Sequence, residues 1–394
     1  MPLANGRHFL AIPGPSVMPD EVLRAMHRPG ANIYEGKLVE MTFAMLPDLA
    51  KVARTAGRPM IYIGNGHAAW EAALVNTLDP GETALVLESG RFAVTWGEMA
   101  SALGIKVEVL NARPRRAVDP EAVEARLRAD KNHEIKAILV VQIDTASGCW
   151  NDIAAIRRAI DAAGHPALFM VDCMASLGCV PYEMDEWGAD VTIAGSQKGL
   201  MTPPGLGFVW ASEKAWAKTP TLTRGRSHWA WEKRAEPEFF YQLFHGTAPV
   251  QHLYALRAAL DMILEEGLEA VWARHAALAA GVRAAVLRWG EGGPLELNMT
   301  EASERSDAVT TVLTGSIDAK RLRTVAETNL NVTLGIGLGI SETGAFRIGH
   351  MGHVNAPMAL GALGAVELAL THIGAPFAPG GVEAAIRAMA PGVA

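Results

Sequence analysis

The chain has 394 residues, of which 50% are hydrophobic and 20% are charged, and its formal net charge is −7. A chain of this length and apolar content can bury the cores of two domains. Acidic and basic residues are spread along it without a basic block, so we expect neither nucleic acid nor an anionic membrane as a partner.

The sequence also carries signals about its compartment. Its N-terminus lacks the basic segment and the long apolar core of a signal peptide, and no apolar run is long enough to span a bilayer. The cysteines Cys149, Cys173 and Cys179 form neither a disulfide framework nor a Cys-x-x-Cys metal pattern. These features predict a protein of the reducing cytoplasm.

The first half of the chain predicts a parallel sheet. An arm over residues 1–30 holds a Pro-Gly-Pro turn and a short helix from Pro19 to about His27, and a helix over 40–56 follows. Strands and helices then alternate, which favours a mostly parallel sheet with helices on both faces. The seven predicted strands are Met60–Ile63, Ala84–Leu87, Lys106–Leu110, Ala137–Val141, Ala167–Val171, Val191–Ala194 and Leu206–Trp210, and the helices between the earlier ones cover about 68–78, 91–103, 119–129 and 152–163.

The pattern changes after about residue 212. The stretch 218–248 is irregular and rich in aromatic and charged residues, and a loop of this length is usually functional rather than connective. A long helix with leucines on one face follows and stops at Gly267. The remaining predicted elements are helices near 268–288, 318–328 and 355–372 and strands near 308–314, 331–334 and 345–348.

We therefore expect an α/β fold with three parts. These are the N-terminal arm over 1–30, a large domain over 31–265 built on the seven-stranded sheet, and a smaller α+β C-terminal domain over 266–394.

A glycine-rich loop, Gly64-Asn-Gly-His-Ala-Ala69, follows a strand and opens a helix. Free backbone N–H groups and the positive end of the helix dipole make such a loop a phosphate site. The loop also fits the G-x-G-x-x-A dinucleotide fingerprint, and the next strand ends in Glu88 at the spacing of a ribose contact. An NAD-dependent dehydrogenase is therefore an alternative, although that fingerprint usually sits on the first strand. A tight turn with small residues for packing is the purely structural alternative.

Two strand ends carry charged residues. Asp172 ends the strand Ala167–Val171, where a buried carboxylate is costly unless it meets a cation such as a protonated pyridine nitrogen. Lys198 follows the strand Val191–Ala194, and burial there would lower its pKa and free its amine as a nucleophile. The alternatives are an aspartate that caps the next turn and a surface lysine that opens a loop.

Two further positions suggest binding groups. Thr145 follows the strand Ala137–Val141, where a hydroxyl can donate to a phenolate or a phosphate, although a turn is the default interpretation. Arg347 lies inside an apolar strand and needs a carboxylate partner, which is either a substrate or a structural ion pair. His350 and His353 have a spacing found in metal sites, but a third ligand is missing, so we predict no metal.

Together these groups match the needs of pyridoxal 5′-phosphate (PLP). A helix N-terminus holds a phosphate, an acid holds a pyridinium nitrogen, a lysine forms an imine, and an arginine holds a substrate carboxylate.

At this point the chain resembles a known family, the class V (subgroup IV) PLP-dependent aminotransferases of fold type I. It is most similar to the alanine, serine and aspartate–glyoxylate aminotransferases, and the resemblance runs nearly from end to end. The motifs that carry it are Pro13–Ser16, Gly66–Asn76, Val171–Gly178, Gly195–Lys198, Pro203–Gly205, Thr247–Val250 and Arg347–Gly352.

The resemblance implies a role for each site residue. Lys198 would be the Schiff-base lysine, Asp172 the partner of the pyridinium, and Arg347 the ligand of the substrate α-carboxylate. The other implied cofactor contacts are the backbone of Gly66, His67 and Ala68 around the phosphate, Gln197 beside it, Thr145 near the phenolic oxygen and Phe92 on the ring. Thr247 would reach the phosphate of a neighbouring subunit, which implies a homodimer with shared sites and possibly a higher oligomer.

Some positions depart from the family pattern. Phe244 stands where many relatives have a tyrosine, so one phosphate hydrogen bond is lost or comes from Tyr241 or His245. Many glyoxylate-using relatives carry His-Arg-Ser-Pro where this chain reads Ile33-Tyr-Glu-Gly36, which leaves their usual substrates open here. Tyr34, a predicted substrate contact, and the Arg347–Gly352 motif also resemble pyridoxamine–pyruvate aminotransferase.

We therefore predict a homodimeric PLP aminotransferase with ping-pong kinetics. It would move an amino group from alanine, serine or aspartate to a small 2-oxo acid such as glyoxylate or pyruvate. The alternatives are a pyridoxamine–pyruvate-type aminotransferase, a PLP-dependent lyase or cysteine desulfurase, a PLP-binding protein without turnover and, more distantly, the NAD-dependent dehydrogenase.

Overall fold

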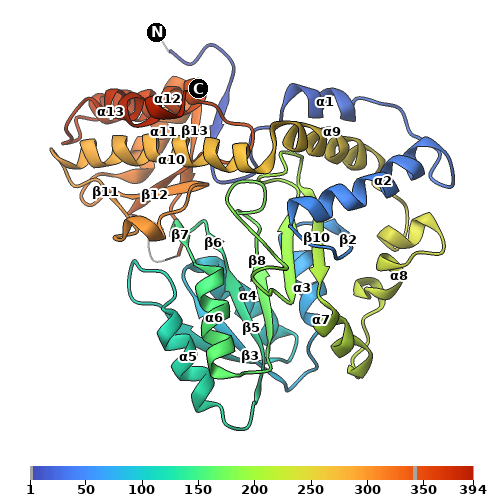
Figure 1. Ribbon diagram of the computed structural model, residues 1–394. Helices are drawn as coiled ribbons and strands as arrows, with labels where there is room; N and C mark the ends of the chain where they lie inside the picture. Colours follow the sequence, from blue (N-terminus) through green and yellow to red (C-terminus); the bar gives the residue numbers. More distant parts are fainter. Residues whose placement is uncertain (1–2, 340–343, 394) are drawn as a thin grey trace.

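The computed structural model describes residues 3–339 and 344–393, and two β-sheets organise two lobes (Figure 1). The larger sheet has seven strands in the order β2-β10-β9-β8-β5-β3-β4. These strands are β2 (Met60–Gly64), β3 (Thr83–Glu88), β4 (Lys106–Asn111), β5 (Ile135–Val141), β8 (Leu168–Asp172), β9 (Val191–Gly195) and β10 (Gly205–Ala211).

The seven predicted strands are the seven strands of this sheet, and the predicted mostly parallel topology is confirmed. Only β10 runs antiparallel to both of its neighbours, β2 and β9. Every residue of β8 and β9 is buried, as expected for strands that are covered on both faces.

Side chains alternate along each strand between two hydrophobic cores. In β3, Leu85 and Leu87 pack into the core shared with α2, α5, α6 and α9, whereas Ala84 and Val86 pack toward α3 and α4. The helices of this lobe are α1 (Asp20–Met26), α2 (Lys37–Val52), α3 (Gly66–Val75), α4 (Arg91–Ala102), α5 (Pro120–Ala129), α6 (Ile153–Ala163), α7 (Glu213–Lys218), α8 (Glu232–Ala235) and α9 (Val250–Glu266). A two-stranded hairpin, β6 (Ile143–Asp144) with β7 (Cys149–Trp150), lies at the carboxyl end of β5.

The smaller sheet has the order β1-β13-β14-β12-β11 and its own hydrophobic core. Its strands are β1 (Phe9–Ala11), β11 (Glu296–Leu297), β12 (Val309–Leu313), β13 (Val332–Ile336) and β14 (Ala345–Gly349), and its helices are α10 (Leu268–Gly290), α11 (Ala319–Leu330), α12 (Ala356–His372) and α13 (Gly381–Met389). The helices α9 and α10 follow one another across the top of the molecule and join the two lobes (Figure 1). The predicted division at residues 30 and 265 stays a prediction.

The strand β1 was not predicted. We expected an extended turn in the arm, but residues Phe9–Ala11 pair in parallel with Val332–Leu334 of β13. The arm therefore belongs to the smaller sheet, although it is followed directly by the large lobe in sequence.

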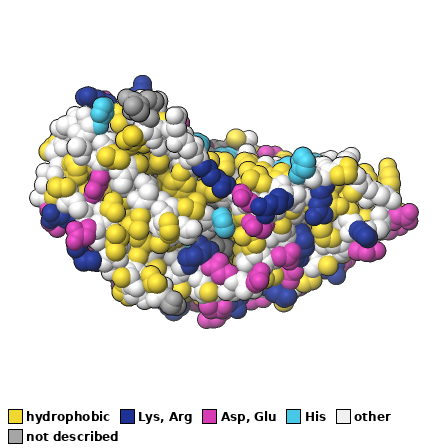
Figure 2. All heavy atoms as spheres, turned by 90° about the horizontal axis from the view of Figure 1, so that it is seen from above, with side chains coloured by type: hydrophobic (Ala, Val, Ile, Leu, Met, Phe, Trp, Pro, Cys, Tyr) yellow, Lys and Arg dark blue, Asp and Glu magenta, His cyan; other side chains and the backbone are white. Residues whose placement is uncertain are grey.

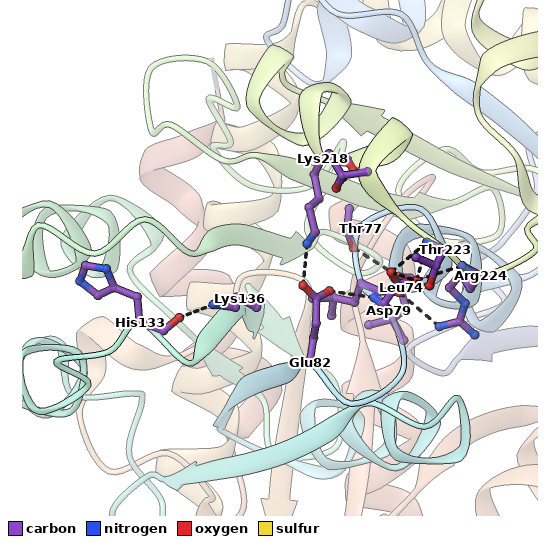
Figure 3. A network of polar contacts seen from close by, with 11 residues as sticks. Leu74, Thr77, Asp79, Glu82, His133, Lys136, Lys218, Thr223 and Arg224 are labelled. Carbon is purple, nitrogen blue, oxygen red and sulfur yellow. Dashed lines mark hydrogen bonds and ion pairs between the residues drawn. The ribbon is translucent and has the colours of Figure 1, made fainter.

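The irregular stretch 218–248 consists of short helical turns that pack on the large lobe. Its start is fixed to the turn between α3 and β3, because the Asp79 carboxylate accepts from Thr223 N (2.9 Å) and Arg224 N (3.0 Å) (Figure 3). Lys218 Nζ donates to Glu82 in the same turn, at 2.6 Å. The stretch thus supports β2 and α3.

On the face that Figure 2 shows, charged side chains of one sign do not gather into a single patch. Acidic and basic side chains lie there among hydrophobic ones. Within the described residues, none of the helices has the length and apolar character needed to cross a membrane.

Candidate active site

A cavity of about 200 Å³ lies at the carboxyl ends of β5 and β8, where the N-terminus of α3 points toward it. Catalytic groups collect at this edge in α/β folds, because the loops that follow parallel strands meet there. The lining residues are Asn65, Gly66, His67, Trp70, Phe92, Val141, Ile143, Thr145, Asp172, Met174, Ala175, Gln197 and Lys198.

The N-terminus of α3 forms one wall of the cavity. Asn65 is its N-cap, and the Asn65 side chain accepts a hydrogen bond from His67 N at 3.0 Å. Gly66 lies so close to Met174 that a Cβ atom there would be 2.4 Å from Met174 Cε. The glycine therefore lets the backbone N–H groups face the cavity, where they and the helix dipole favour an anion.

Asp172 lies at the end of β8 and is buried, with 1% of its surface exposed. Its carboxylate accepts from Trp70 Nε1 at 2.9 Å and from the backbone N–H of Met174. Burial raises the pKa of Asp172 to about 7, because these two hydrogen bonds and the charge of Lys198 only partly offset the desolvation. A cationic group in the cavity would restore the ordinary, ionised state of this carboxylate.

Lys198 follows β9 and points its amine into the site, where Nζ donates to the carbonyl of Pro13. Burial and, to a smaller extent, the charge of Arg347 lower the pKa of Lys198 to about 8. The amine is therefore neutral, and nucleophilic, at a much lower pH than that of an exposed lysine.

This shift gives a test on the chain without any cofactor. The acylation rate of Lys198 should rise with pH to a midpoint near 8, because only the neutral amine reacts and burial favours that form. Peptide mass spectrometry after limited acylation follows the Lys198 peptide across the pH range, and a midpoint near the ordinary lysine value of about 10.4 would contradict the lowered pKa of Lys198.

Arg347 lies in β14 beside the cavity and is buried, with 7% of its surface exposed. Its guanidinium donates to two backbone carbonyls, Ile336 O at 2.6 Å and Thr145 O at 2.9 Å, and it has no carboxylate within ion-pair distance in the described part of the chain. Burial lowers the pKa of Arg347 to about 10, with a partial offset from the charge of Asp144. The guanidinium has the chemistry to take a ligand's carboxylate, and the two roles predicted for Arg347, a substrate contact and a structural ion pair, both stay predictions.

The buried carboxylate of Asp144 arranges the opposite wall. It accepts hydrogen bonds from Phe92 N (2.8 Å) and Ala93 N (3.1 Å) at the N-terminus of α4, and from Ala146 N (2.9 Å). These bonds fix Phe92 and Thr145, which both line the cavity, relative to one another.

The residues of this cavity fit PLP. The α3 N-terminus suits its phosphate, the buried Asp172 suits its protonated ring nitrogen, and Lys198 supplies an amine for its aldehyde. The side-chain oxygen of Gln197 is buried without a hydrogen-bond partner, so a donor from outside the chain would satisfy it.

The structure brings most of the predicted site residues together, but four of them do not line the cavity, and one of these is Arg347, which lies beside it. Ala68 lies in the first turn of α3 and is half-buried, whereas Thr247 and Tyr34 are exposed, Tyr34 to 82%. Phe244 is buried against Phe240, with ring centroids 5.5 Å apart. The roles inferred for these residues from the resemblance stay predictions.

Several residues of the site were not predicted. Trp70 carries a signal that would have found it, because a buried indole N–H needs an acceptor and the acid at the end of β8 offers one. Asn65 has the residue type and position of an N-cap. Pro13 acts through its backbone carbonyl, which no residue pattern reveals.

The two histidines considered for a metal do not act together. His350 is buried, and its ring nitrogens bond Asp307 O (2.9 Å) and Thr310 Oγ1 (2.9 Å), whereas His353 is exposed. Residues 3–339 and 344–393 contain no group of three or more His, Cys, Asp or Glu residues that could hold a metal ion.

Comparison with known proteins identifies the family. The model of the "Aminotransferase class-V" family matches residues 41–349. The chain belongs to the class-V aminotransferases. This aminotransferase is 40% identical to a serine–glyoxylate aminotransferase of Methylorubrum extorquens, with 96% of this chain and 95% of the relative covered. It is 36% identical to an L-aspartate–glyoxylate aminotransferase of Paracoccus denitrificans, covering 95% and 94% of the two chains.

The fold of the aminotransferase agrees with that of solved relatives. The crystal structure of pyridoxamine–pyruvate aminotransferase from Mesorhizobium loti superposes with a TM-score of 0.89 at 30% identity, over 98% of this chain and 97% of that one. The predicted fold type I is thus confirmed, and the dehydrogenase alternative for the Gly64–Ala69 loop is wrong.

Proposed function

We propose that this aminotransferase holds PLP in the cavity at the end of β8 and transfers an amino group between a small amino acid and a small 2-oxo acid. Lys198 would hold the cofactor covalently, Asp172 its ring nitrogen, and the backbone of Gly66, His67 and Ala68 its phosphate, with Gln197 beside the phosphate. When bound, PLP supplies an electron sink for the bond that breaks at the substrate's α-carbon.

Side chains of the protein itself can supply proton transfer, a charge partner for the cofactor and a contact that orients the substrate. The amine of Lys198 is neutral above a pH of about 8, so it can take and return a proton at physiological pH with little cost. Asp172 is ionised once a cation lies against it, and Arg347 orients the substrate by its carboxylate. Phe92 and Trp70 narrow the cavity and keep water from it.

The substrates are inferred from relatives. The relatives are named for serine, aspartate and pyridoxamine as donors and for glyoxylate and pyruvate as acceptors. We therefore propose alanine, serine or aspartate as the donor, with pyridoxamine as the second candidate that the likeness to the Mesorhizobium enzymes supports.

The observation that carries this proposal is the pairing of two buried, oppositely shifted groups in one cavity. Lys198 is easier to deprotonate than usual and Asp172 is harder to deprotonate, so the amine suits an electrophile and the carboxylate suits a cation in the cavity.

The test is an absorbance titration of the purified, PLP-loaded protein with single amino donors, followed by single 2-oxo acids. We expect one of alanine, serine or aspartate to bleach the cofactor's visible band and glyoxylate or pyruvate to restore it. Bleaching by pyridoxamine alone would select the second candidate, whereas a band that no amine changes would contradict amino-group transfer.

The assembly and compartment form part of the proposal. A homodimer with shared sites would give Thr247 and Tyr34, which are exposed in the single chain, a place at the partner's cavity. The three unpaired, buried cysteines favour the reducing cytoplasm. Burial also raises the pKa of Cys149, Cys173 and Cys179, which disfavours the thiolate that a cysteine desulfurase would need.

Substitution of the buried arginine tests how the substrate is held. The Arg347→Gln variant should lose about 10–100-fold in kcat/KM for amino acids, because a hydrogen bond to a charged group contributes about 1.5–3 kcal/mol. The control is a simple alkylamine, which has no carboxylate and should react equally slowly with both proteins. An equal loss with both kinds of amine would show that Arg347 only supports the fold.

A further inference from the structure

The segment Ile12–Ser16 crosses from the small sheet to the site of Lys198. Its start continues β1, which pairs with β13. Its backbone also lies against the end of β14, since a Cβ atom at Gly349 would be 2.1 Å from Ile12 O. The small sheet therefore fixes the position of the first residues of this segment.

The end of the segment is bonded to the loop that carries the lysine. Ser16 N donates to Gln197 O at 2.9 Å, and Ser16 Oγ donates to Lys198 O at 2.7 Å. Ser16 is buried, with 5% of its surface exposed, so these bonds are protected from water. Two hydrogen bonds therefore join Ser16 to the backbone of the loop that carries Lys198.

The middle of the segment meets the lysine side chain itself. The amine of Lys198 donates to the carbonyl of Pro13. Gly14 leaves space for it, because a Cβ atom there would lie 2.3 Å from Lys198 Nζ and 2.6 Å from Cδ. A side chain of any kind at position 14 would displace the amine from this carbonyl.

We propose that the Pro13 carbonyl is a positioning group that docks the Lys198 amine whenever it is not bonded to the cofactor, and so orients it for proton transfer. The orienting role rests on the proposed function. Lysine has a long and flexible side chain, and a free amine without a partner would sample many positions. An amine that donates one N–H to Pro13 O cannot turn its lone pair toward that oxygen, so the lone pair stays available on the cavity side.

The decisive variant is Gly14→Ala, and its matched control is Gly81→Ala. Both glycines have a positive φ, 105° and 88°, so both variants strain the backbone, but a Cβ atom at Gly81 would meet nothing within 4 Å. Ser16→Ala is measured in parallel, because it loosens the segment without adding an atom or requiring a left-handed backbone.

The first measurement needs no cofactor and no catalysis. The full chain is acylated with a small anhydride at about pH 9, where an amine of pKa about 8 is mostly neutral, and the Lys198 peptide is quantified by mass spectrometry. Gly14→Ala should react roughly tenfold faster than the wild type and Ser16→Ala roughly threefold faster, because an undocked amine samples more positions and meets the anhydride outside the confined cavity. Gly81→Ala should match the wild type.

The second measurement is the single-turnover rate of amine transfer in the PLP-loaded proteins. Gly14→Ala should be about 100-fold slower than Gly81→Ala at saturating donor, since a misplacement of about 1 Å has effects of this size. Acylation rates of Gly14→Ala and Ser16→Ala within twofold of the wild type would overturn the docking. Faster acylation with an unchanged single-turnover rate would overturn the orienting role. If Gly14→Ala does not fold, the acylation of Ser16→Ala decides alone.

The two proposals fail in different ways. A wild-type protein that transfers no amine refutes the proposed function, but the acylation comparison still decides whether Pro13 docks Lys198.

Discussion

The Lys198→Ala variant is expected to lose amino-group transfer by a factor of about 10⁴ or more, because we propose that the lysine amine both anchors the cofactor and carries the proton. The variant should still bind PLP, since the α3 N-terminus, Asp172 and Gln197 are unchanged. The measurement is the single-turnover absorbance change with the preferred donor, together with the PLP content after gel filtration.

Two controls separate a chemical loss from a structural one. Lys106→Ala removes an exposed lysine of β4 and should leave the rate unchanged. Added ethylamine should partly restore amine transfer to Lys198→Ala, because the deleted side chain leaves room beside the cavity for a small amine. Turnover of Lys198→Ala near the wild-type rate would refute the assignment of this lysine.

The second large effect is expected for Asp172→Asn, which keeps the shape of the side chain but removes its charge. Without the carboxylate, the ring nitrogen of the cofactor loses the partner that keeps it protonated, and kcat should fall by roughly 10²–10³-fold. Trp70→Phe is the matched comparison, because it removes one hydrogen bond to Asp172 and leaves the charge in place. Its loss should be about tenfold, the value of a single hydrogen bond to a charged group.

Asp172→Asn should lower the activity of the loaded protein but raise the stability of the cofactor-free protein at neutral pH. The pKa of Asp172 is about 7 in the folded chain and near its ordinary value of 3.8 in the unfolded one. The folded state therefore binds the extra proton between these values, and its stability falls as the pH rises through this window. Wild-type protein should become less stable from about pH 4 to pH 7, and Asp172→Asn should lack that part of the decline.

Urea unfolding at several pH values measures this difference. A parallel decline in both proteins would mean that Asp172 is not the group responsible, and it would weaken the case for an unpaired carboxylate in the cavity.

The large lobe could be predicted from the sequence because its signals are local and redundant. Most strands of the seven-stranded sheet are short apolar runs, and the helices between the earlier strands follow in regular alternation. Lys198 and Asp172 could be singled out for the same reason, since a charged residue at the end of such a run has few structural explanations.

The unpredicted parts depend on contacts that no local pattern encodes. The strand β1 has three residues and pairs only with a segment near the other end of the chain. The role of Asp144 could not be predicted, because two of the backbone N–H groups that donate to it belong to α4, about 50 residues earlier in the chain. A single chain cannot place Thr247, since its predicted role lies in a neighbouring subunit.

The pairing of β1 with β13 also sets an order for the folding of the protein during synthesis. The hydrogen-bonded side chains of His8 and Thr333 are 325 positions apart, so the arm leaves the ribosome long before its partner strand exists. The large sheet can assemble in the meantime, because its strands all lie between residues 60 and 211. The segment Ile12–Ser16 then reaches Lys198 only after β13 and β14 have been made. Lys198 therefore cannot gain its contacts with Pro13 and Ser16 in their final arrangement before residues 332–349 have been synthesised.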